Sequence, residues 1–136
     1  MTTTLVDTSA FITLLDDADA RFGEAFRWLD EVVTERSESL VTHTYVVVET
    51  IAVTQRRLGV AAVRAFVDHL LPMCTVRFVD EPLHQRATAA YLAGLDRQVS
   101  FVDRVSFELM RAEGIARAFA FDPDFSREGF DTVPVA

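Results

Sequence analysis

Four carboxylates stand where apolar runs of this chain end or are interrupted. They are Asp7, Glu49, Asp103 and Asp122. A buried carboxylate without a partner is costly, so acids placed repeatedly at the edges of apolar segments indicate one shared cation. Carboxylate oxygens suit Mg²⁺ or Mn²⁺, and these ions can activate water for attack on a phosphodiester. The pattern therefore predicts a divalent metal site.

Taken singly, three of these acids have simpler structural explanations. Asp7 could bridge a turn or cap a helix, and Asp103 could be an ordinary N-cap. Asp122 precedes Pro123, which is a common way to open a turn. For each acid alone the structural explanation is favoured, so the metal hypothesis depends on the set.

Glu49 is different because it interrupts an apolar helical stripe, where a cap is not needed. Two explanations remain equally favoured for it. It could be a metal ligand, or it could form a buried ion pair with an arginine such as Arg56 or Arg104.

Composition excludes several kinds of site. All 13 basic residues other than histidine are arginine, so a Schiff-base or P-loop lysine is impossible. Cys74 is the only cysteine, which excludes intrachain disulfides and cysteine-based zinc sites. A receiver domain would need a lysine, and a dehalogenase-type phosphatase would need an aspartate where Ser9 stands. The net charge of −8 argues against binding a polyanion without metal ions.

The apolar periodicity alternates between strand and helix patterns along one domain, residues 1–136. This alternation predicts an α/β fold, a three-layer sandwich with a central, mostly parallel sheet flanked by helices. Thr8 or Ser9 would cap the first helix. Expected strands are 3–6, 39–42, 74–79, 118–121 and 131–135, and expected helices are 9–15, 20–36, 44–58, 60–71, 82–94 and 101–113.

The ordered acids and their neighbours resemble the PIN domain of VapC-type toxins. The likeness rests on Leu5-Val6-Asp7-Thr8-Ser9, on Glu49 in a helix, on Phe101-Val102-Asp103 and on the segment around Asp122, and it spans essentially the whole chain. The resemblance implies an Mg²⁺- or Mn²⁺-dependent endoribonuclease whose metal site comprises Asp7, Glu49, Asp103 and Asp122. It also implies a homodimer that is silenced by a cognate antitoxin.

Three further residues match supporting positions in this resemblance. Thr8 and Ser9 could orient a metal-bound water, although capping is favoured, and Asp124 is either a supplementary ligand or an exposed turn residue. We predict RNA contacts at arginines near helix ends and near the Asp103 loop, with a surface salt bridge as the favoured alternative for Arg104. These arginines are Arg56, Arg57, Arg97 and Arg104.

Other residues are expected to be structural. His43, His69 and His84 lack the spacing of metal ligands and are predicted to lie at the surface or its boundary. Trp28 is predicted to pack in the core.

The leading hypothesis is a ribonuclease toxin in a reducing cytoplasm, because no signal peptide or membrane span is recognisable. The alternative is a catalytically silent PIN-fold module that binds a partner protein through the same acids.

Overall fold

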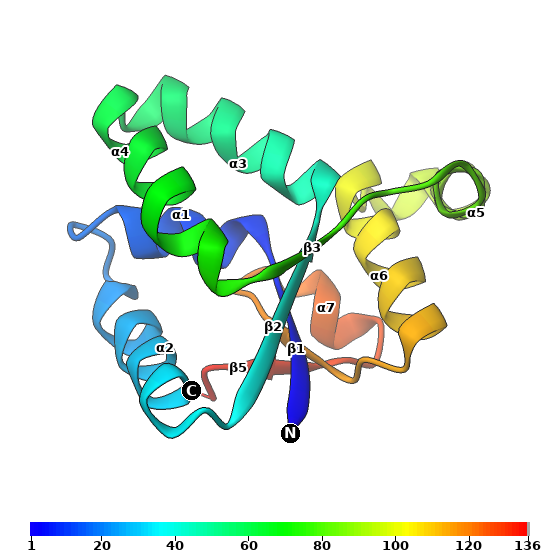
Figure 1. Ribbon diagram of the computed structural model, residues 1–136. Coiled ribbons are helices and arrows are strands. Elements are labelled where there is room, and N and C mark those ends of the chain that lie inside the picture. Colours follow the sequence, from blue (N-terminus) through cyan, green and yellow to red (C-terminus); the bar gives the residue numbers. More distant parts are fainter. Residues whose placement is uncertain (136) are drawn as a thin grey trace.

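A five-stranded sheet organises the structure, a computed structural model that describes residues 1–135 (Figure 1). The strand order is β3-β2-β1-β4-β5, and all four neighbouring pairs run parallel. The predicted α/β architecture is therefore confirmed. The strands are β1 (Thr2–Val6), β2 (Glu38–His43), β3 (Thr75–Arg77), β4 (Arg117–Phe119) and β5 (Asp131–Val133).

Seven α-helices connect the strands and cover the sheet. Among the helices of the described chain, none has the length and apolar character required to cross a bilayer. The helices are α1 (Thr8–Leu15), α2 (Phe22–Glu35), α3 (Thr44–Arg57), α4 (Val60–Ala65), α5 (Glu81–Ala93), α6 (Phe101–Glu113) and α7 (Asp124–Arg127). Three short helical turns complete the set: η1 (Phe66–Leu70), η2 (Leu71–Met73) and η3 (Leu95–Arg97).

Two hydrophobic cores lie on opposite faces of the sheet. Successive strand residues point to opposite faces, so Leu5 packs with residues of α5, α6 and α7, whereas Val6 packs with residues of α1, α2 and α3. Trp28 packs on Phe119 in the second core, with ring centroids 4.6 Å apart, as predicted. Helix, sheet and helix thus form three layers.

Most predicted helices and strands match the structure, although the short helix α7 was not predicted. The helix expected over 60–71 ends as α4 and continues as a wider π-turn, η1, before Pro72, because proline cannot continue an α-helical ladder. The strands expected at 74–79, 118–121 and 131–135 are shorter, at Thr75–Arg77, Arg117–Phe119 and Asp131–Val133. The single-domain expectation ends at Ala136, which lies outside the described residues.

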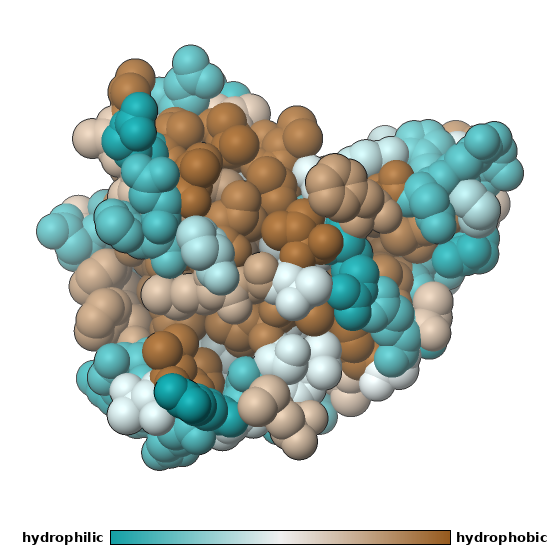
Figure 2. Space-filling view, viewed as in Figure 1, coloured by the Kyte–Doolittle hydropathy of each residue, from teal (hydrophilic) through white to brown (hydrophobic). Residues whose placement is uncertain are grey.

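The surface is uneven in polarity. Figure 2 shows hydrophobic residues gathered over the α4 region, on the face seen in Figure 1, and hydrophilic residues over α5. Large apolar side chains exposed along α4 and the segment that follows it include Val60, Val67 and Met73.

Candidate metal centre

The four predicted acids line one open cleft of about 650 Å³. All strands are parallel, so their carboxyl ends share one edge of the sheet, and ligands of such sheets bind beyond that edge. Thr8, Ser9, Asp124 and Arg57 line the same cleft. The sequence segments that carry the acids therefore converge in space, as the metal hypothesis requires.

Asp7 joins the end of β1 to the start of α1. Its backbone N–H donates to the Phe119 carbonyl at 3.0 Å, which continues the pairing of β1 with β4. Its Oδ2 accepts hydrogen bonds from the Ser9 N–H at 3.1 Å and the Ser9 hydroxyl at 2.6 Å. The other oxygen, Oδ1, is buried without a hydrogen-bond partner in residues 1–135. A buried carboxylate oxygen left free at a cleft is available to a cation.

Three aspartates approach one another in the cleft. Asp103, in the first turn of α6, and Asp122 and Asp124, around the start of α7, each offer one oxygen within 4.8 Å of the others. The Asp124 N–H donates to Asp122 Oδ1 at 2.9 Å, which fixes the turn between them. Among the described residues this close group includes neither Asp7 nor Glu49, which face the same cleft.

Glu49 projects from α3, and a histidine fixes the start of that helix. His43 Nδ1 accepts hydrogen bonds from the N–H groups of Tyr45 and Val46, and His43 Nε2 lies 2.8 Å from the Ser106 hydroxyl of α6. This histidine therefore connects the helix that carries Glu49 with the helix that carries Asp103. No ion pair of Glu49 is formed within residues 1–135, so the structure lacks the buried arginine pairing.

Burial and mutual repulsion disfavour charge on two of the acids. Burial raises the pKa of Asp7, which is 3% exposed, to about 6, and the charges of Asp122 and Glu49 add to this effect, while the Ser9 hydrogen bonds oppose it. Burial raises the pKa of Asp103, 5% exposed, to about 9, and the charge of Asp7 and a hydrogen bond with Asp122 contribute. A cation would relieve this repulsion and displace the proton.

The residues present fit a hard divalent cation. The donor set consists of carboxylates, one buried oxygen lacks a partner, and three oxygens lie close enough to share an ion. The Ser9 hydroxyl holds the Asp7 carboxylate in place as an outer partner of the site.

The predicted arginines take different positions. Arg57 lines the cleft, Arg97 lines a neighbouring depression that shares Asp124 with the cleft, and Arg56 is exposed on α3. Arg104 is only 6% exposed, and its Nη1 donates to Glu128 at 3.2 Å. The salt bridge of Arg104 is thus buried, and the expectation of a surface salt bridge is wrong. This geometry favours the ion pair over an RNA contact.

Three smaller expectations are also corrected. Asp7 itself caps α1, and Ser9 binds Asp7, so neither Thr8 nor Ser9 is the cap. Ser100 caps α6 by accepting from the Asp103 N–H, so Asp103 is free to face the cleft. His43 is fully buried, because its ring links α3 and α6.

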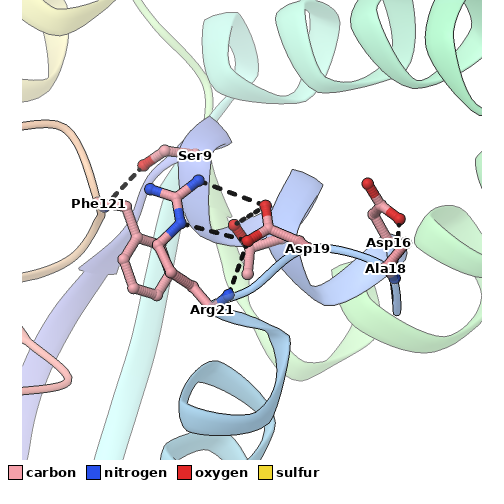
Figure 3. A network of polar contacts seen from close by, with 7 residues as sticks. Ser9, Asp16, Ala18, Asp19, Arg21 and Phe121 are labelled. Carbon is pink, nitrogen blue, oxygen red and sulfur yellow. Dashed lines mark hydrogen bonds and ion pairs between the residues drawn. The ribbon is translucent and has the colours of Figure 1, made fainter.

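Sequence reasoning missed the loop between α1 and α2. Asp16, Asp19 and Arg21 line the cleft, and Figure 3 shows Asp19 and Arg21 bonded beside Phe121. The run of acids at 16–19 directly after the first helix was the available signal.

Comparison with known proteins identifies the family and its relatives. The PIN domain family model matches residues 4–130. The chain is 38% identical over 127 residues to the protein named 23S rRNA-specific endonuclease VapC20 from two strains of Mycobacterium tuberculosis. The alignment covers 92% of this chain and 93% of each relative.

Solved structures agree with this relationship. The crystal structure of Mycobacterium tuberculosis VapC20, described as a sarcin-ricin loop cleaving toxin, superposes with a TM-score of 0.82 and 35% identity over 93% of this chain and 95% of that one. DNA-bound VapBC2 of Rickettsia felis and VapBC of Salmonella typhimurium have TM-scores of 0.71 and 0.68 at 10% and 14% identity, each pair covering 96% or 97% of both chains. The two less similar structures support the fold.

Proposed function

Because this chain belongs to the PIN domain family, we propose that it is a metal-dependent endoribonuclease that acts as the toxin of a toxin–antitoxin pair. The observation that carries the proposal is the single cleft in which Asp7, Glu49, Asp103 and Asp122 meet. The identity with VapC20 along nearly the whole chain supports the same reaction class.

Five carboxylates would hold the cation, Mg²⁺ or Mn²⁺. A bound divalent ion supplies a Lewis acid for the phosphate and lowers the pKa of water. Asp103, Asp122 and Asp124 form the closest group, and Asp7 and Glu49 complete the wall of the cleft.

Asp7 is a proposed metal ligand. Its Oδ1 has no hydrogen-bond partner within residues 1–135 and is free for the cation, while the Ser9 hydrogen bonds hold Oδ2. We propose that Arg57, which is exposed and lines the cleft, contacts an RNA phosphate.

Ribosomal RNA is the substrate class to test first. The relative VapC20 is named as specific for 23S rRNA, and its structure is described as cleaving the sarcin-ricin loop. We propose that this chain also cuts a structured RNA loop, which would place it in the cytoplasm with ribosomes. Cys74, the only cysteine, is free and is compatible with a reducing compartment.

We further propose that protein partners bind the exposed hydrophobic residues of the α4 region. Val60 and Val67 are exposed in the α4 region, where Figure 2 shows hydrophobic residues gathered. Exposed apolar patches of this kind mark protein interfaces, and a homodimer contact or a cognate antitoxin fits there. The solved VapBC relatives support an antitoxin partner.

A cleavage assay on purified ribosomes and on a sarcin-ricin loop oligonucleotide tests the function. Asp7→Asn and Asp122→Asn should each reduce Mn²⁺-dependent cleavage by at least about a hundredfold, since each removes a charged group at the cleft. The matched control is Asp30→Asn, an exposed acid on α2 outside the cleft, which should cleave like the unmodified chain. Undiminished cleavage by the cleft variants would refute the site. No cleavage of any RNA by the unmodified chain would favour the silent binding module.

A further inference from the structure

The acidic cleft contains one arginine in a fixed position that no sequence motif identified. Seven carboxylates and two arginines, Arg21 and Arg57, line the cleft. Phosphates of a nucleic acid are repelled by carboxylates, so the positively charged side chains are the groups of this cleft wall that can attract them. Arg57 ends a helix with its side chain exposed, whereas Arg21 is held from two sides.

Asp19 holds Arg21 from one side (Figure 3). Asp19 Oδ1 accepts from the Arg21 backbone N–H at 2.8 Å and from Nε at 3.3 Å, while Oδ2 accepts from Nη2 at 3.3 Å. The Thr13 hydroxyl donates to the same Oδ2 at 3.4 Å. The hydrogen bonds from Arg21 hold the pKa of Asp19 below its usual value, so this aspartate stays charged.

Phe121 holds the guanidinium from the other side. The Arg21 guanidinium carbon lies over the Phe121 ring, 4.7 Å from its centre, in a cation–π contact. Phe121 directly precedes Asp122, and its backbone N–H donates at 2.9 Å to the Ser9 hydroxyl, which itself donates to Asp7. Arg21 is therefore positioned relative to two acids of the metal centre by a continuous chain of contacts.

One edge of this guanidinium remains free. Arg21 is 47% exposed, and within residues 1–135 its Nη1 makes no hydrogen bond. A planar guanidinium held on a ring presents its remaining N–H groups in a fixed direction, which lowers the entropy lost when they bind an anion. An arginine that only held a surface loop in place would not need to line the cleft.

We propose that Arg21 is a substrate-binding residue that contacts a phosphate of the RNA strand beside the metal centre. The inference rests on the proposed ribonuclease function and adds a phosphate position to it. The contact orients the strand so that the scissile phosphate meets the carboxylates. Asp19 and Phe121 act as positioning residues, because they fix the guanidinium and touch no RNA in this proposal.

Steady-state cleavage kinetics on the RNA that the unmodified chain cuts test the role of Arg21. Arg21→Gln should lower kcat/KM about 10- to 100-fold, mainly through KM, because it removes one charge-assisted phosphate contact. The slope of log(kcat/KM) against log[salt] should become less steep by about 0.7, the share of one single-strand phosphate contact. Arg21→Lys keeps the charge and should keep the salt slope.

The matched control is Arg64→Gln. Arg64 also pairs with an aspartate, Asp68, but it is 80% exposed on α4 and lies outside the cleft. Its replacement should leave KM, kcat and the salt slope unchanged. Calorimetric titration with Mn²⁺ should give the same affinity for Arg21→Gln as for the unmodified chain, which separates RNA binding from the metal site.

A scan with single neutral methylphosphonate linkages locates the contact. Each linkage removes one phosphate charge, and the linkage that faces Arg21 should raise KM for the unmodified chain and have no effect on Arg21→Gln. If Arg21 has only a structural role, Arg21→Gln should have a lowered melting temperature, and its loss of activity should add to the effect of every methylphosphonate linkage. That result would overturn the inference. If the unmodified chain cuts RNA and Arg21→Gln matches it in KM and salt slope, the inference is wrong while the proposed function stands.

Discussion

Asp103 shows how a single residue balances stability against binding. It is 5% exposed, and burial together with neighbouring acids raises its pKa to about 9. Near neutral pH the metal-free protein therefore keeps a proton at Asp103 that the unfolded chain releases. Folding then becomes less favourable as pH rises between the unfolded and folded pKa values. The proton at Asp103 makes the metal-free site destabilising at neutral pH, and a cation bound there would reverse this cost.

We predict that Asp103→Asn makes the metal-free protein more stable and abolishes its response to Mn²⁺. The amide is a neutral substitute of the same shape, so it removes a carboxyl whose burial opposes folding by on the order of 2 kcal/mol near pH 7. Thermal unfolding in EDTA and in Mn²⁺ measures both effects. An Mn²⁺-induced rise in melting temperature as large as that of the unmodified chain would contradict the prediction.

The single residues that could be predicted are those whose sequence context is itself unusual. Asp7 and Glu49 end or interrupt apolar runs, so neighbouring residues were enough to mark them as candidates for one shared site, and both line the cleft. The partner of His43 is 63 positions away in Ser106, and nothing local indicates it. Arg21 was missed for the same reason, because its ring partner Phe121 belongs to a distant strand end.

At the scale of elements, His43 joins two helices that carry acids. Its ring caps α3 through Nδ1 and meets Ser106 of α6 through Nε2. The ring therefore needs an unprotonated Nδ1. Burial lowers the pKa of His43 to about 4, so the folded protein resists the proton that the unfolded chain accepts.

We predict that His43 makes the fold sensitive to acid. Its stabilising effect is present above the unfolded pKa and is lost as pH falls from about 6.5 to about 4. Urea unfolding should show that the unmodified chain loses about 2 kcal/mol more than His43→Asn between pH 7 and about pH 5. Asparagine retains a cap acceptor and does not titrate.

The control for this comparison is His69→Asn, an exposed histidine in η1. It should show the same pH dependence as the unmodified chain. A pH dependence of His43→Asn identical to that of the unmodified chain would show that His43 is not the group responsible.

A second contact between elements ties α6 to the end of α7. Arg104 donates to Glu128 Oε1 at 3.2 Å, and Arg111 donates to Oε2 at 2.8 Å. Gly94 leaves room for Arg104, because a Cβ at position 94 would lie 2.5 Å from Arg104 Nη2. Arg104 directly follows Asp103 in α6, and Glu128 follows Asp124 at the end of α7. The ion pair between Arg104 and Glu128 therefore helps to fix the distance between the two aspartates.

We predict that Glu128→Ala destabilises the protein by about 3 kcal/mol, because it leaves a buried guanidinium without a counterion. Adding Arg104→Met should recover much of this loss, since the unpaired charge is then removed. Chemical denaturation measures both variants. Asp68→Ala, which breaks the exposed pair with Arg64, is the matched control and should cost less than about 0.5 kcal/mol.

Elements with strong periodicity were predicted well. The helix expected over 101–113 matches α6, Phe101–Glu113, because an apolar stripe ends at Gly114, which has a positive φ of 69°. The helix expected over 60–71 was only partly right, since periodicity does not distinguish an α-turn from a π-turn near Pro72.

For the whole molecule, the net charge has the same sign as the charge of the proposed RNA substrate. The chain carries −8, and seven carboxylates line the cleft. Bulk electrostatics therefore opposes RNA, and only local cations can reverse the potential at the site.

We predict that RNA binding requires a divalent cation. At matched ionic strength, Mn²⁺ should tighten binding of a sarcin-ricin loop oligonucleotide by at least about tenfold relative to sodium chloride, measured by fluorescence anisotropy. Asp103→Asn should lose this gain. Equal affinities in the two salts would show that the protein binds RNA without help from the acidic centre.

The alternation of strands and helices was enough to predict the layered fold, because it excludes most other architectures. The strand order was not predictable in the same way. Placing β1 between β2 and β4 depends on pairings between distant segments, such as Leu5 with Ala118.

That central place of β1 has a consequence during synthesis. The first strand can pair with β4 only after residue 119 has been made, and the Ser9 hydroxyl meets the Phe121 N–H across 112 positions. A nascent chain that stops before β4 lacks Asp122 and also lacks the strand that pairs beside Asp7. Such a fragment cannot assemble the proposed metal site.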